Sequence, residues 1–144
     1  MINKATIKDS AILAELAINI FENNLINDLK TEFCEDLNNE NIVFFIKYIN
    51  NNPIGFAQCN IRVDYVEGTS SSPVGYLEGI YIKEEYRCNG FAKELLLECE
   101  KWAKEKGCKE FASDCELSNT NSLNFHLAVG FEEVKRIICF KKKI

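Results

Sequence analysis

The sequence predicts an α/β domain in which helices flank one mixed sheet. Two observations carry this prediction. Helical and extended patterns alternate along the 144 residues with no repeat and no long linker, and 47% of the residues are hydrophobic. A chain of this length and composition can bury a core of its own, so we expect a single domain over residues 1–144.

The amino-terminal half is predicted to hold two helices and three strands. Apolar and polar residues alternate over 2–7, which is typical of a half-buried strand. Four apolar residues spaced by four, from Leu25 to Leu37, indicate one face of a helix. The expected elements are a strand over 2–7, helices over 10–20 and 25–37, and strands over 42–49 and 54–65.

The carboxy-terminal half continues this alternation. A strand is expected over 74–82 with Glu78 in its middle, and a helix follows that begins near Phe91 and reaches about Lys106. Gly107 is its expected C-cap. The remaining expected elements are a strand over 110–114, a helix over 121–129 and a last strand over 134–140.

Charge and cysteine content narrow the class of protein. The 17 basic and 22 acidic residues leave a net charge of -5, so nucleic acid and membrane are poor partners and a cationic small molecule is a better one. The seven cysteines form no C-x-x-C pair and His126 is the single histidine, so no metal is expected. No apolar run reaches the roughly 18 residues of a membrane span, and residues 1–6 lack the apolar run of a signal peptide. We therefore expect a cytoplasmic protein.

The segment Arg87-x-x-Gly90-x-Ala92 lies where the strand over 74–82 passes into a helix. The first turn of a helix has amides without partners, and small residues there let a phosphate approach the backbone. Arg87 adds a positive charge, which predicts a site for a diphosphate. The alternative is an ordinary strand-to-helix turn that contains a glycine; the lysine of a P-loop is missing.

Two acids stand out as candidates for chemistry. Glu78 is a charge inside a strand, which is costly to bury without a purpose, and Asp114 ends the next strand, where open α/β sheets place ligands. A further seven acids against one lysine lie within residues 15–40; a solvated helix face explains most of them. These carboxylates would suit a cationic substrate.

The segment Arg87-x-x-Gly90-x-Ala92 resembles motif A of the GNAT superfamily of N-acetyltransferases, (Q/R)-x-x-G-x-(G/A). A second segment, from Asn119 through Ser122, Phe125 and His126 to Phe131, resembles the N-x-x-A-x-x-(L/F)-Y-x-x-x-G-F segment of the same superfamily. Further similarity is to the aminoglycoside 6'-N-acetyltransferases, and within them to the short-chain branch found in Acinetobacter-type resistance enzymes. The segments that carry it are 61–69, 72–81, 102–104, 110–114 and 140–143.

The resemblance implies the GNAT fold, a single mixed and mostly antiparallel sheet with splayed central strands, and acetyl-CoA as cosubstrate. The pantetheine arm would pair with the backbone of Ile80, Tyr81 and Ile82, and the amide near Ile80 would polarise the thioester carbonyl. The pyrophosphate would bind to Arg87, Cys88, Asn89, Gly90, Phe91 and Ala92, with Asn119 as a further acetyl-CoA contact. The aminoglycoside would contact Phe21, Asn24, Tyr65, Glu78 and Asp114.

The family pattern is not followed everywhere. The branch usually has tryptophan at the position of Phe21. It usually has an acidic residue at the position of Lys135, and the lysine that stands there in this chain would repel an ammonium group. In the superfamily a tyrosine usually protonates the departing thiolate, and His126 occupies the position of that tyrosine. His126 either protonates the thiolate or packs on its helix. The homodimers usual in this branch lead us to expect one here, with residues 137–140 either at its interface or in a buried strand.

The expected reaction is direct transfer of an acetyl group to an aminoglycoside amine within a ternary complex. The amine is mostly protonated at neutral pH and must lose a proton before it attacks. Either Glu78 or Asp114 is the candidate base, and the sequence leaves both open. Two alternatives to this function remain: acetylation of another amine, such as a polyamine or a protein N-terminus, and a non-catalytic CoA-binding module.

Overall fold

The protein, as a computed structural model that describes residues 1–144, contains five strands, four α-helices and two short 3₁₀ helices. In chain order they are β1 (Ile2–Lys4), η1 (Ile7–Asp9), α1 (Ser10–Ala17), α2 (Ile26–Leu37), β2 (Ile42–Ile49), β3 (Asn52–Arg62), β4 (Val74–Ile82), η2 (Glu84–Tyr86), α3 (Phe91–Glu105), β5 (Phe111–Ser113) and α4 (Thr120–Ala128). The strand predicted over 74–82 coincides with β4, while β3 ends earlier than predicted. No helix is both long enough and apolar enough to cross a bilayer.

The strands form one sheet in the order β1-β2-β3-β4-β5. The pairs from β1 to β4 are antiparallel, and β5 joins β4 in parallel. The predicted α/β class with a mixed, mostly antiparallel sheet is therefore confirmed.

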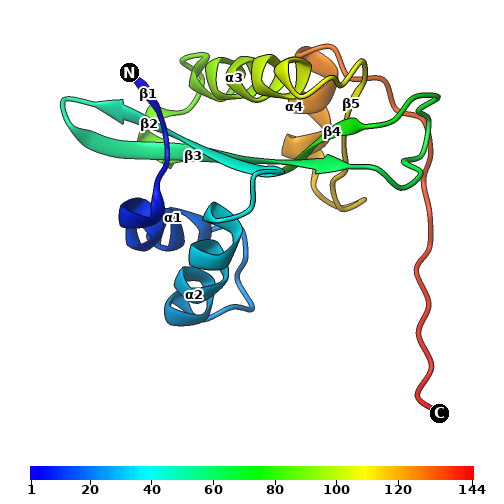
Figure 1. Ribbon diagram of the computed structural model, residues 1–144, viewed down its shortest axis with the longest axis horizontal. Helices are drawn as coiled ribbons and strands as arrows, with labels where there is room; N and C mark the ends of the chain where they lie inside the picture. The colour runs from blue at the N-terminus through cyan, green and yellow to red at the C-terminus, as the bar shows by residue number, and fades with distance from the viewer.

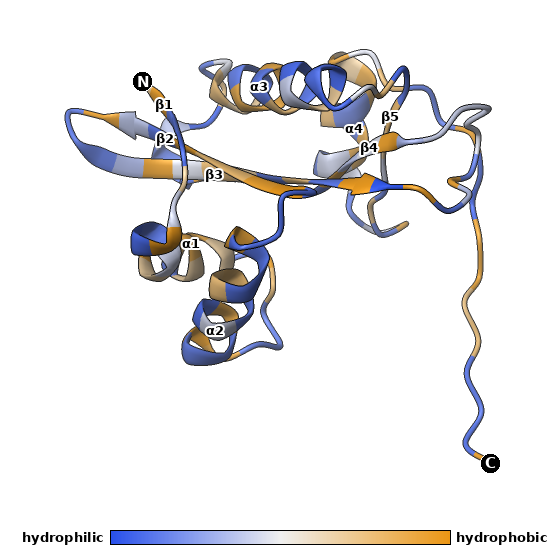
Figure 2. Ribbon diagram, in the orientation of Figure 1, coloured by the Kyte–Doolittle hydropathy of each residue, from blue (hydrophilic) through white to orange (hydrophobic).

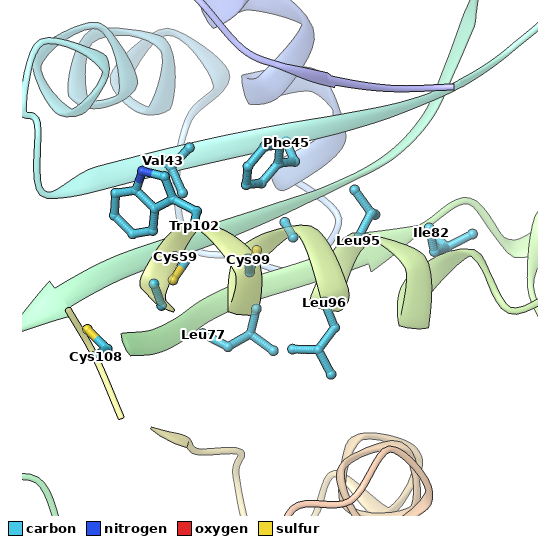
Figure 3. Close-up of a cluster of buried hydrophobic side chains, with 12 residues drawn as sticks. Val43, Phe45, Cys59, Leu77, Ile82, Leu95, Leu96, Cys99, Trp102 and Cys108 are labelled. Carbon is cyan, nitrogen blue, oxygen red and sulfur yellow. The ribbon is translucent and has the colours of Figure 1, made fainter. Parts of the chain in front are cut away.

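Helices cover both faces of this sheet, with α3 on one side and α1 and α2 on the other (Figure 1). Neighbouring residues of β2 point to opposite faces, as the period of a strand requires. Phe45 packs in the cluster beneath α3 with Leu95 and Trp102 (Figure 3), and Phe44 packs with Phe33 of α2. Burial on both faces explains why residues 42–49 read as a dense apolar run.

The sheet opens between β4 and β5. β5 pairs with β4 only from Gly75 to Leu77, so the rest of β4 has no strand along that edge. On the β3 side the register steps from Leu77 opposite Cys59 to Gly79 opposite Gln58, which leaves Glu78 as an extra residue in a β-bulge. Bulges bend a strand and redirect a side chain, and this one lies where β4 parts from β5. The expected splay of the central strands is present.

The last strand predicted from the sequence, over 134–140, is wrong. Residues from Phe131 to Ile144 contain no helix or strand, and the segment extends away from the folded body (Figure 1). An isolated extended segment becomes a strand only when another edge accepts its backbone hydrogen bonds, and within this chain the segment meets none. Its apolar part, residues 137–140, is followed by polar lysines (Figure 2).

Candidate active site

An open helix N-terminus follows β4. Gly90 is the N-cap of α3 with φ 79°, and no side chain caps the helix there. A Cβ placed on Gly90 would meet no atom within 4 Å, and Cys88 before it also has a positive φ, of 61°. The amides of the first turn therefore face open space, and with the helix dipole they suit a phosphate group.

Arg87 is anchored beside the end of β4. Its Nε donates to the carbonyl oxygen of Ile82 over 2.9 Å, and its guanidinium carbon lies 5.7 Å from the centroid of the Tyr81 ring. The residue is otherwise exposed. Its terminal nitrogens are therefore available in the loop that leads to Gly90, which supports its predicted part in anion binding.

A buried lysine steadies the first turn of α3. Lys47 of β2 is 7% exposed, and its Nζ donates to Oε2 of Glu94 and lies 4.7 Å from the centroid of the Phe91 ring. Glu94 by itself would repel a phosphate at this helix end, and Lys47 offsets its charge. The sequence analysis did not single out Lys47.

The unpaired half of β4 offers a free strand edge. β3 occupies one edge, with Ile80 opposite Ala57 and Ile82 opposite Gly55, while no strand pairs with the other edge beyond Leu77. The backbone of the residues predicted to bind pantetheine, Ile80, Tyr81 and Ile82, thus borders the gap. An extended chain that contains amides can pair there as an added strand.

Glu78 is held by an arginine from the neighbouring strand. Arg62 donates to Oε1 of Glu78 from Nη2 over 2.6 Å and from Nε over 3.2 Å. The side chain of Glu78 is 25% exposed and that of Arg62 41%. The guanidinium carbon of Arg62 also lies 3.4 Å from the centroid of the Tyr76 ring. Glu78 is therefore a paired carboxylate, which answers how a charge is accommodated inside this strand.

Asp114 is linked to the Glu78–Arg62 pair through Tyr76. The Tyr76 hydroxyl donates to Oδ2 of Asp114, and the pKa of Tyr76 is raised well above its usual value, first by burial and then by its bond to Asp114 and that residue's charge. The phenol therefore stays protonated and keeps donating. Asp114 itself is exposed, so its carboxylate faces solvent at the mouth of the gap between β4 and β5.

Further carboxylates and an aromatic ring approach Glu78 from the α1–α2 side. Burial raises the pKa of Asp36 on α2, and the charges of Glu32, Glu35 and Glu78 raise it further. A Cβ added to Gly79, beside Glu78, would lie 3.4 Å from Cζ of Phe21. The structure thus gathers the predicted residues Phe21, Glu78 and Asp114 around one negatively charged region.

His126 is engaged at both ring nitrogens. Its Nδ1 donates to the carbonyl oxygen of Ser122 at 2.6 Å, and its Nε2 lies 2.8 Å from Oγ of Ser113 on β5. The ring centroid is 5.1 Å from that of Phe131. A catalytic His126 would have to exchange one of these bonds for its substrate, and the packing role considered for it is real.

The remaining predicted contacts are placed at the margins. Asn119 is the N-cap of α4, and its Oδ1 accepts from the amide of Ser122 over 3.1 Å, so its amide nitrogen is what remains for a ligand. Asn24 and Tyr65 are exposed in loops and have no hydrogen bond with Glu78 or Asp114. Lys135 forms a surface ion pair, at 3.0 Å, with Glu67.

A family comparison assigns this arrangement. The model of the acetyltransferase (GNAT) family matches residues 11–131. The chain belongs to the GNAT acetyltransferase family. The prediction of a GNAT acyltransferase is confirmed. The open half of β4 and the uncapped N-terminus of α3 lie at the residues for which acetyl-CoA binding was predicted.

Individual relatives of this GNAT chain are aminoglycoside 6'-N-acetyltransferases. The chain is 43% identical over 109 residues to aminoglycoside N(6')-acetyltransferase type 1 of Salmonella typhimurium, which is 76% of this chain and 75% of that protein. It is 35% identical over 141 residues to the enzyme of the same name from Stenotrophomonas maltophilia, 97% of this chain and 91% of that protein. The relative from Acinetobacter genomosp. 13 is 48% identical over 91 residues, 63% of this chain and 62% of that protein.

Solved structures agree. The complex of AAC(6')-Iy with the bisubstrate analogue CoA-S-monomethyl-acetylneamine has a TM-score of 0.94 and 34% identity, covering 100% of this chain and 98% of that one. AAC(6')-Ih from Acinetobacter baumannii has a TM-score of 0.90 and 33% identity, covering 100% and 98%. The predicted likeness to the aminoglycoside 6'-N-acetyltransferases is therefore confirmed.

Three residues of this GNAT site were missed by sequence reasoning: Arg62, Tyr76 and Lys47. One signal was present, because Tyr76 lies two residues before Glu78 on one strand and so shares its face. The contact of Arg62 with Tyr76 and Glu78 depends on strand register and on the bulge at Glu78. The contact of Lys47 with Glu94 depends on how α3 packs on the sheet, and none of these can be read from local periodicity.

Proposed function

We propose that this chain is an acetyl-CoA-dependent N-acetyltransferase that transfers an acetyl group to the 6'-amino group of aminoglycosides. One observation carries the proposal: the free edge of β4 runs between the open N-terminus of α3 and the carboxylate group of Glu78 and Asp114. An activated acyl carrier and a cationic amine can thus meet along a single strand.

The residues present fit acetyl-CoA. Open space in front of Gly90 leaves room for the pyrophosphate, with Arg87 as its counter-charge and the first-turn amides as donors. The backbone from Ile80 to Ile82 would take the pantetheine arm, and Asn119 adds an amide donor. When bound, acetyl-CoA supplies the thioester whose acetyl group is transferred.

The substrate side fits a polycation. Glu78 and Asp114 provide anions, Phe21 provides a face on which a sugar ring can stack, and Asn24 and Tyr65 are exposed at the margins. Tryptophan is usual at the position of Phe21 in the family branch, and phenylalanine can still stack on a sugar ring. Lys135, where the branch usually has an acidic residue, would repel an ammonium group, so we expect a narrower set of accepted aminoglycosides.

Proton movement assigns the roles in the reaction. Asp114 would take one proton from the substrate ammonium, leaving a neutral amine whose lone pair forms the new C–N bond as the C–S bond breaks. The sulfur leaves with that electron pair, and the nitrogen must lose a second proton to become an amide. We propose that Nε2 of His126, once it has released Ser113, takes this second proton and passes it to the departing sulfur. The amide near Ile80 would polarise the thioester carbonyl. The transfer needs no covalent enzyme intermediate.

The proposal includes a homodimer in the cytoplasm, where acetyl-CoA is produced. In the carboxy-terminal segment, residues 131–144, Ile137 is 66% exposed, Ile138 80% and Phe140 90%. Single chains rarely expose contiguous apolar side chains to this extent, and a second copy would remove them from water. Their exposure in the isolated chain supports the interface considered for residues 137–140.

A thiol-release assay with matched amines tests the proposed activity. Neomycin carries a 6'-amino group where paromomycin carries a 6'-hydroxyl, so turnover of neomycin without turnover of paromomycin is expected. Kanamycin and tobramycin should also release thiol from acetyl-CoA. Turnover of spermidine with none of any aminoglycoside would instead favour a GNAT for another amine, and CoA binding without thiol release would favour a non-catalytic module.

A further inference from the structure

Arg62 is the feature of the site that the proposed reaction leaves unexplained. It is a cation within a region meant to receive cations, and its two bonds go to the same oxygen, Oε1 of Glu78. Its guanidinium carbon is 3.4 Å from the Tyr76 ring centroid, within the range of a cation–π contact. The side chain is thus fixed by β4 on two sides.

The contacts join two carboxylates into one unit. Glu78 is bound to Arg62, Arg62 lies over Tyr76, and Tyr76 donates to Asp114. The two acids differ in their partners, because Glu78 has a cation and Asp114 has a neutral hydroxyl. An approaching ammonium group therefore meets competition at Glu78 and none at Asp114.

We infer that Arg62 is a positioning residue: it occupies Oε1 of Glu78 as an internal cation and so directs the reacting ammonium of the substrate to Asp114. This inference rests on the proposed function and deepens it, since it assigns the base among the two acids that the sequence left open. Oε2 of Glu78 remains free to hold a second, non-reacting ammonium group of the polycation.

Replacing Arg62 with glutamine keeps a polar side chain and removes the charge. The freed Glu78 should then compete for the reacting ammonium, so that more substrate binds in an unproductive position. We expect kcat and the KM for kanamycin each to fall about fivefold, the scale of a partly exposed ion pair, with kcat/KM nearly unchanged. Arg62→Lys keeps the charge, so its kcat and KM should lie between those of the unaltered chain and those of Arg62→Gln. Lys101→Gln on α3, away from the site, is the control for net charge.

A double-mutant cycle shows whether Arg62 acts through Glu78. In a Glu78→Gln background, Arg62→Gln should change kcat and KM by less than about twofold, because the competing carboxylate is gone. An undiminished effect in that background, a rise in the KM for kanamycin, or no change in the single variant would each overturn the inference.

Failure of the proposed function is separable. If the unaltered chain acetylates no aminoglycoside, the function proposed above is wrong. The inference is then decided by calorimetric binding of kanamycin, in which Arg62→Gln should still tighten the dissociation constant about fivefold. Equal or absent binding in both chains would reject it.

Discussion

Tyr76 of β4 donates its phenolic hydrogen to Oδ2 of Asp114, which follows β5 directly. The bond crosses the two strands near the point where their pairing ends at Leu77 and Ser113. A neutral donor leaves the charge of Asp114 intact and fixes its orientation. The proposed base is therefore held by a residue that itself takes no part in proton transfer.

Tyr76→Phe keeps the ring and removes this donor. We expect kcat to fall about tenfold, in line with the loss of a hydrogen bond to a charged group, with the KM for acetyl-CoA unchanged. Steady-state kinetics with kanamycin and acetyl-CoA measure both. Tyr86→Phe is the matched control, because Tyr86 lies in η2 and has no hydrogen bond with Glu78 or Asp114. Equal activity of the two variants would contradict the positioning of Asp114 by Tyr76.

The same hydroxyl predicts how stability changes at alkaline pH. Burial first, and then Asp114, raise the pKa of Tyr76 from the ordinary value of 10.0. Because the folded pKa lies above the unfolded one, the stabilisation by the protonated phenol is complete below pH 10 and is lost as the pH rises further. Urea midpoints between pH 8 and 11 should fall more steeply for the unaltered chain than for Tyr76→Phe.

Asp114→Asn removes the proposed base and keeps its size. We expect kcat to fall by roughly 10²- to 10³-fold, because general-base catalysis contributes on this scale, while binding of acetyl-CoA stays within about twofold. Glu116→Gln, an exposed acid two positions on, should leave both values unchanged. Equal activity of Asp114→Asn and the unaltered chain would remove Asp114 as the base.

Gly90→Val fills the space in front of α3. We expect it to abolish CoA binding, since the valine side chain would occupy the open position that the pyrophosphate is proposed to take. Gly107→Val is the control: Gly107 also has a positive φ, of 90°, with open space around its Cβ, at the other end of α3. Both variants should lose about 1–2 kcal/mol of stability to the left-handed backbone, and only the first should lose CoA in a calorimetric titration.

Asp36→Asn tests the negative region beside Glu78. Burial, then Glu32, Glu35 and Glu78, raise the pKa of Asp36 from 3.8. Its charged form therefore destabilises the folded chain at neutral pH, and the variant should gain up to about 1 kcal/mol at pH 7, a gain that vanishes below pH 4. Kanamycin binding should weaken in the same variant. A lower free energy of unfolding for Asp36→Asn at pH 7, measured in urea, would reject the statement that the charged form of Asp36 destabilises the folded chain.

Phe140→Asp tests the proposed dimer. The side chain is 90% exposed, so the fold of one chain should keep its unfolding midpoint. Light scattering should report a dimer for the unaltered chain and a monomer for the variant, because a charge in an apolar interface is strongly unfavourable. A monomeric unaltered chain, or an unchanged mass in the variant, would show that residues 137–140 are not the interface.

Local pattern was sufficient for most of the secondary structure. β4 lies where it was predicted, and α3 begins at Phe91 as expected, because the period of apolar residues and a glycine at each end of α3 are local properties. The strand over 134–140 failed for the opposite reason. The continuous apolar run over residues 137–140 indicates a tendency to extend, whereas a strand also requires an edge to pair with.

The sequence by itself determined the fold class, the glycine-containing turn at Arg87 to Ala92 that is proposed to bind phosphate, and the candidacy of Glu78 and Asp114. Each depends on residue type and spacing over a few positions. The tertiary structure alone decided that Arg62 neutralises Glu78, that Tyr76 orients Asp114 and that Lys47 offsets Glu94. Those pairings join residues up to 47 positions apart. Strand register and the bulge at Glu78 bring the residues of β3, β4 and β5 together, and the packing of α3 on the sheet brings Glu94 to Lys47.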